Sequence, residues 1–67
     1  MSVAVGDRFA EIERPSRVWE VLEVRAMNAR PHARLRNLDD PTRLITLAVS
    51  VLEDRHTFRR TPSAHAA

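Results

Sequence analysis

Apolar residues occur along this chain in short runs, separated by turn-forming residues at intervals of roughly ten to twelve positions. This spacing is typical of all-β sandwiches and barrels. The runs predict five strands, over residues 3–13, 18–27, 32–38, 43–49 and 56–60. A single helical turn is expected over residues 50–55. The pattern therefore predicts an all-β fold, a small five-stranded barrel with a one-turn 3-10 helix before the last strand.

The second run has strong strand propensity but does not alternate strictly between apolar and polar residues. Trp19 and Val21 share one face of an extended strand, whereas Val24 falls on the opposite face. A β-bulge near Leu22 and Glu23 would return Val24 to the core and bend the strand, as a small barrel requires.

The third run has the pattern of a strand with one face toward solvent. Ala33 and Leu35 alternate there with His32, Arg34 and Arg36. We therefore expect the three basic side chains to lie together on the outward face.

Residues 40–54 allow two interpretations. Asp40 as cap and Pro41 in the first turn would begin a helix well. The segment is, however, rich in β-branched residues, which disfavour helix. Ser50 and Glu53 also form a separate capping-box pattern. We expect a strand followed by a helical turn, and one longer helix is the alternative.

This order of elements resembles the Src-homology-3-like (SH3-like) barrels, a fold class that includes small bacterial proteins. The resemblance rests on Gly-Asp-Arg-Phe at residues 6–9, Trp-Glu-Val at residues 19–21 and Ser-Val-Leu at residues 50–52. It implies one barrel domain over residues 1–60. Residues 61–67 are small and polar, and we expect them to form a disordered tail.

Two functional groups within that fold class can be compared with these residues. Peptide-binding and methyl-lysine-binding modules need several exposed aromatic rings, whereas this chain has only Phe9, Trp19 and Phe58. The type II dihydrofolate reductases have a similar Gly-Asp-Arg opening. Their Val-Gln-Ile-Tyr segment, however, is replaced here by residues 44–49, which lack the glutamine and tyrosine, so we expect no reductase activity.

The 67 residues allow one domain, and a chain this short buries about 60% of the surface that it exposes when unfolded. It has no cysteine, which excludes disulfides and thiolate zinc sites. His32, His56 and His65 lack carboxylates at ligand spacing, so we expect no metal and no cofactor. Trp19 and Phe9 are expected in the core.

Charge points to one candidate surface. The net charge is only +2, but all eleven basic residues are arginines, and arginine forms forked contacts with phosphate and carboxylate groups. The outward face of the third strand, with its neighbours, is the candidate binding surface, and its residues are Arg25, His32, Arg34, Arg36 and Arg43. The alternative is a solvated face neutralised by Glu11, Glu20 and Glu23 across the strands. Further basic clusters are Arg55, Arg59 and Arg60, and Arg14 with Arg17.

Such a surface suits nucleic acid or an acidic protein, and the sequence leaves both open. Reversing the charges of Arg34 and Arg36 is expected to abolish binding and leave the fold intact. Self-association through edge strands is a third expectation.

No catalytic arrangement is recognised. The carboxylate pairs Asp39–Asp40 and Glu53–Asp54 fall in turns, no serine has a suitable histidine and acid, and Gly6 is the one glycine. We therefore expect a non-catalytic binding or adaptor module.

No segment is apolar enough to span a membrane, and residues 1–7 lack a signal-peptide layout, so we expect the bacterial cytoplasm.

Overall fold

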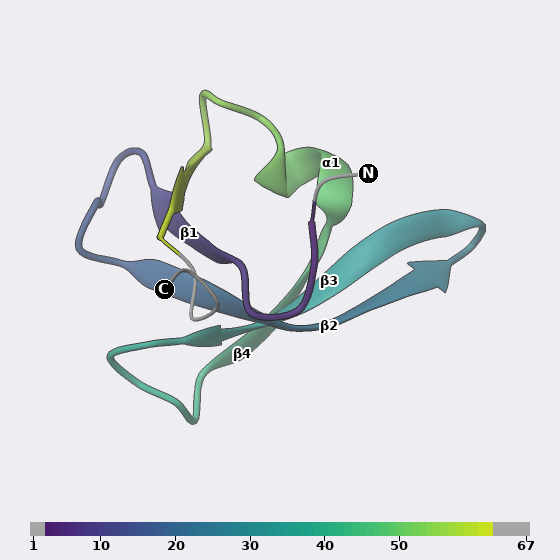
Figure 1. The fold of residues 1–67 in the computed structure, drawn as a ribbon, viewed down its shortest axis with the longest axis horizontal. Coiled ribbons are helices and arrows are strands. Elements are labelled where there is room, and N and C mark those ends of the chain that lie inside the picture. The colour runs from purple at the N-terminus through teal and green to yellow at the C-terminus, as the bar shows by residue number, and fades with distance from the viewer. Residues whose placement is uncertain (1–2, 63–67) are drawn as a thin grey trace.

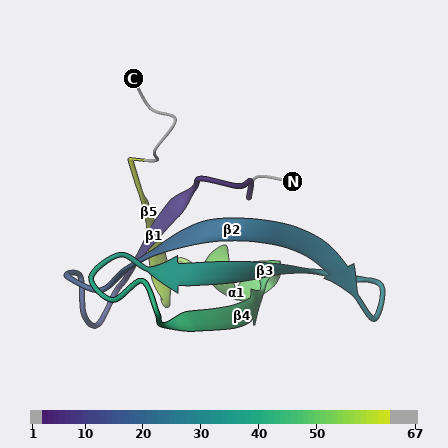
Figure 2. The same cartoon turned by 90° about the horizontal axis from the view of Figure 1, so that it is seen from below.

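The computed structural model describes residues 3–62, and these form one antiparallel sheet with a short helix. The strands are β1 (Arg8–Glu11), β2 (Val18–Met27), β3 (Arg30–Asn37), β4 (Leu44–Ala48) and β5 (Phe58–Thr61), and α1 (Val49–Leu52) lies between the last two (Figure 1). The sheet order is β4-β3-β2-β1-β5, so β4 and β5 are its edges. Figure 2 shows β1 and β5 lying across the other strands at the end of the sheet where β2 begins.

The predicted bulge in β2 is present. The pairing of β2 with β3 shifts register between Val21 and Glu23, so Leu22 is the additional residue. Val21 pairs with Leu35 and Val24 with Ala33, and both pairs face inward. Val24 therefore packs against the core, as the sequence led us to expect.

The β2–β3 hairpin has a tighter turn than the sequence suggested, because β3 begins at Arg30 rather than His32. Met27 pairs directly with Arg30, which leaves a two-residue loop. Both loop residues have positive φ, 55° at Asn28 and 64° at Ala29. This geometry matches the right-handed twist of the strands, but it favours glycine at the position that Ala29 occupies.

Replacing Ala29 with glycine is expected to stabilise the domain by about 0.5–1 kcal/mol, because the left-handed conformation costs alanine more than glycine. Urea denaturation measures the difference. The matched control is Ala26→Gly in the strand of the same hairpin, which should destabilise by a similar amount. An equal loss in both variants would contradict a strained turn at Ala29.

Residues 40–54 form a strand and a short helix, so the single-helix alternative is wrong. Two details of the expectation are also wrong. The capping box at Ser50 is not formed: the helix starts at Val49 with Ala48 as its cap, and no side chain caps it. The turn is α-helical rather than 3-10, because the Glu53 amide donates to the Val49 carbonyl at 3.0 Å. The helix starts early because Val49 and Leu52, one turn apart, are both buried.

The last strand begins at Phe58 and not at His56, because Asp54 organises the preceding turn. Its carboxylate accepts a hydrogen bond from the His56 amide at 2.9 Å and from the Thr57 hydroxyl at 3.1 Å. The amide hydrogen bond from His56 is the main reason that the pKa of Asp54 lies below its ordinary value. The carboxylate acts here as a turn former, as expected for an acidic pair in a turn.

Thr61 belongs to β5 and pairs with Arg8, so the expectation that the disordered tail starts at residue 61 is wrong for this residue. The remaining tail prediction, for residues 63–67, lies outside the described residues. The other expected strand ends differ from the observed ones by a few positions, most at β1, which spans four residues rather than eleven.

The core lies between the curved sheet and α1. Phe9, Trp19 and Phe58 are all buried, which confirms the prediction that Trp19 and Phe9 belong to the core. Aliphatic residues from β2, β3 and α1 complete the core, namely Val21, Ala33, Leu35, Val49 and Leu52, with Val3 from the N-terminal segment.

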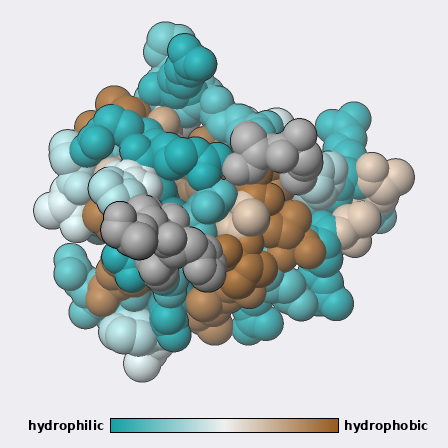
Figure 3. All heavy atoms as spheres, in the orientation of Figure 1, coloured by the Kyte–Doolittle hydropathy of each residue, from teal (hydrophilic) through white to brown (hydrophobic). Residues whose placement is uncertain are grey.

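Figure 3 shows the resulting surface from one side, with an apolar patch near its centre and hydrophilic side chains around it. The all-β prediction with one helical turn before the last strand is confirmed, and the element order is the one expected for an SH3-like barrel.

Candidate functional site

The outward face of the sheet gathers most of the basic residues that the sequence singled out. Residues directly opposite each other in a sheet lie on the same face. The outward pairs are Arg8 with Glu20, Glu20 with Arg36, Glu23 with Arg34, and Arg25 with His32. We call this surface the arginine face, formed by Arg8, Arg25, His32, Arg34 and Arg36. Arg8 was not among the predicted residues, because its strand neighbours cannot be deduced from local sequence.

Glu20 neutralises one end of the arginine face. One of its carboxylate oxygens lies 2.7 Å from Nη2 of Arg36, and the other lies 3.3 Å from Nη2 of Arg8. The Glu20 side chain is only 13% exposed, so solvent competes weakly for these contacts. The hydrogen bond from Arg36 is the largest cause that holds the pKa of Glu20 below its ordinary value, and Arg8 adds to it against the opposing effect of burial.

We expect Glu20→Gln to lower stability at pH 7, and the difference from the wild type to shrink in acid. A carboxyl group whose pKa is lowered by folding stabilises fully above its ordinary value of 4.5, and this contribution is lost as the pH falls through the folded value. Urea denaturation between pH 7 and pH 3 measures the effect.

The control for that series is Glu23→Gln. Glu23 lies 3.9 Å from Arg25, and both side chains are well exposed, so its loss should change stability little. A stability difference between Glu20→Gln and wild type that stays constant down to pH 3 would contradict the role given to Glu20.

The other end of the arginine face is a hollow of about 330 Å³, which we call the basic groove. Arg25, His32 and Arg34 supply its basic groups, and Glu23 is its one acidic residue. Arg34 makes no ion pair within residues 3–62. The remaining lining residues are Met27, Leu44, Ile45 and Thr46. The structure thus brings together three of the five predicted residues.

The two remaining predicted residues have different surroundings. Arg36 lies on the same face but is paired with Glu20. Arg43 does not join the face: it precedes β4 in the β3–β4 turn, where its amide donates to the Asp40 carbonyl at 2.9 Å. Its side chain lines a separate hollow with Arg17 and Asp39. Sequence reasoning placed Arg43 inside the strand, which begins one residue later.

In the alternative of an outward face neutralised across the strands, Glu20 does pair across the strands, with Arg8 and Arg36. Glu23 contacts only Arg25 of its own strand, at 3.9 Å, and Glu11 does not contact the face. Glu11 accepts a hydrogen bond from the Trp19 indole nitrogen at 2.9 Å, and it also lies 3.7 Å from Nε of Arg17. This carboxylate therefore supports the core ring and the first loop rather than the arginine face.

The C-terminal basic cluster of Arg55, Arg59 and Arg60 lines a different hollow, which is larger than the basic groove.

Within residues 3–62, no three histidine or carboxylate side chains are gathered as they would be around a metal ion. In the same residues, no helix is long and apolar enough to cross a membrane.

Comparison with protein-family models, with curated proteins and with solved structures found no match for this chain.

Proposed function

We propose that this chain is a non-catalytic binding module of the SH3-like class, and that its basic groove contacts the phosphate backbone of nucleic acid. The observation that carries this proposal is the convergence of Arg25, His32 and Arg34 on one hollow, with no ion pair to Arg34 in the described residues. A guanidinium group without an acidic partner is available for a forked contact with phosphate.

The surroundings of the groove favour backbone contact over base reading. All three aromatic rings are buried, so the groove has none on which a base can stack. Met27 and Leu44, each 43% exposed, offer only aliphatic surface beside the arginines. Binding should therefore be electrostatic, sensitive to salt and nearly independent of base sequence.

The test is a salt titration of the full chain with labelled single-stranded and double-stranded oligonucleotides, followed by fluorescence anisotropy. We expect the logarithm of the affinity to fall linearly with the logarithm of the salt concentration. Absence of binding at low salt would overturn the proposal and leave an acidic protein surface as the partner of the groove.

A second candidate function is self-association through β4, and a feature of that edge favours it. β4 has the sequence Leu-Ile-Thr-Leu-Ala, without a charged residue, whereas the opposite edge, β5, carries Arg59 and Arg60. Uncharged edge strands are prone to pair with other chains. Sedimentation velocity tests the idea, because Thr46→Lys should convert an oligomer into a monomer. A wild-type chain that is monomeric at high concentration would exclude it.

A further inference from the structure

A second hollow in the described part of the chain is lined by residues of β1, α1 and β5 and is separate from the basic groove. Its volume is about 570 Å³, within the range of small-molecule sites. Its apolar lining comes from Phe9, Ile12, Leu52 and Phe58. Three of these side chains are at least nine-tenths buried, and Ile12 is 41% exposed. The hollow therefore has a covered apolar floor and one open apolar wall.

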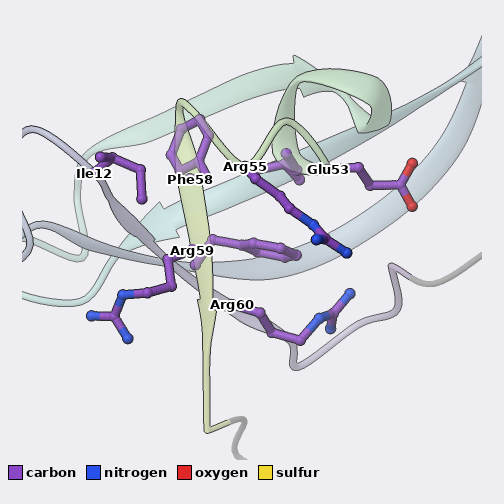
Figure 4. A pocket seen from close by; sticks show the side chains of 8 residues that line it. Ile12, Glu53, Arg55, Phe58, Arg59 and Arg60 are labelled. Carbon is purple, nitrogen blue, oxygen red and sulfur yellow. The ribbon is translucent and has the colours of Figure 1, made fainter.

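Arginines surround this apolar floor (Figure 4). Arg55 and Arg60 extend to the same side of β5, and Arg59 extends to the opposite side. Arg60 is held in place twice: its guanidinium carbon lies 4.9 Å from the centre of the Phe9 ring, and its Nη1 lies 2.7 Å from Oδ2 of Asp7. Arg55 is exposed and makes no ion pair within residues 3–62.

This arrangement selects the chemistry of a ligand. An apolar floor favours an alkyl chain or an aliphatic side chain, because its burial removes apolar surface from water. Two arginines on one side of the hollow favour an anion, and their planar forks match a carboxylate. Glu53 also lines the hollow, and its carboxylate disfavours ligands that carry a second acidic group near it, because like charges repel.

We propose that this hollow, the Phe9–Arg55 pocket, binds a carboxylate carried on an apolar body, with the carboxylate between Arg55 and Arg60. Two sources share that chemistry, a free alkyl carboxylate and the carboxy-terminal residue of a peptide that ends in an aliphatic side chain. The proposal does not depend on nucleic-acid binding, because the basic groove and this pocket have no lining residue in common.

The experiment titrates the full, isotope-labelled chain with octanoate and, separately, with acetyl-Gly-Gly-Leu, and follows amide chemical shifts. We expect saturable shifts at residues 52–60 with at least one of the two ligands. Octan-1-ol and the amidated peptide test the carboxylate and should bind more weakly. Saturation by octanoate alone identifies a free carboxylate as the source, and saturation by the peptide alone identifies a peptide terminus.

The decisive variant is Arg55→Gln, and its matched control is Arg14→Gln, since both arginines are exposed and lack ion pairs in the described residues. Loss of a charged hydrogen bond should weaken carboxylate binding about ten-fold in Arg55→Gln and leave the neutral ligands unchanged. Arg14→Gln should behave as the wild type. The proposal is overturned if neither carboxylate gives saturable shifts at the pocket, or if the two variants lose affinity equally.

Discussion

Replacing Trp19 with alanine is expected to unfold most of the domain at room temperature. The side chain is 4% exposed, and its residue pairs with Phe9 on one side and Asn37 on the other, at the centre of the sheet. Removal of a buried indole costs about 3–5 kcal/mol. A chain of 67 residues has a total stability of roughly 3–10 kcal/mol, so this loss removes a large part of it.

Circular dichroism and amide chemical-shift dispersion measure this effect, since the variant lacks the tryptophan whose fluorescence would otherwise report unfolding. The matched control is Trp19→Phe, which keeps an aromatic ring but loses the hydrogen bond to Glu11. We expect that variant to stay folded with reduced stability. A Trp19→Ala protein with the urea midpoint of the wild type would refute the core assignment.

Reversing the charges of Arg25 and Arg34 together is expected to abolish nucleic-acid binding at physiological salt. Both arginines line the basic groove, so Arg25→Glu with Arg34→Glu removes two phosphate contacts and adds two repulsive charges. The slope of log affinity against log salt should fall by about 0.7 for each lost contact on a single strand. The salt titration of the double variant at low salt gives that slope.

The choice of Arg25 rather than Arg36 follows from the structure. Arg36→Glu would place a carboxylate where a guanidinium nitrogen now lies 2.7 Å from Glu20, so we expect the reversal of Arg36 to destabilise the fold as well as to affect binding. The matched control is Arg14→Glu with Arg55→Glu, which changes the net charge equally away from the groove. Equal losses of affinity in the two double variants would show that net charge, and not the groove, controls binding.

Several features of the fold could be predicted because they are local. The irregular alternation around Val21 and Val24 located the bulge in β2, and the density of β-branched residues identified β4 as a strand. The start of α1 could not be predicted in the same way. Ser50 and Glu53 have the capping-box pattern, but burial of Val49 and Leu52 against the sheet determines the helix start.

The candidate site was predictable only in part, for a similar reason. Alternation along β3 placed His32, Arg34 and Arg36 on one face correctly. It did not show that Glu20 holds Arg36 and Arg8, because the register between three strands decides which charges meet. Arg43 was misplaced because it alternates with Leu44, which lies opposite Arg36 on the outward face, so side-chain alternation along β4 does not place Arg43 on that face.

The sequence by itself determined the fold class, the strand periodicity and the chemical character of the chain, since these depend on residue type and near-neighbour spacing. The tertiary structure decided which arginines are paired and which are available, and it placed Arg60 over Phe9 beside a hollow that Arg55 also lines. The physical reason is that an ion pair or a pocket depends on distances between residues far apart along the chain. Those distances are set only when the sheet has curled around its core.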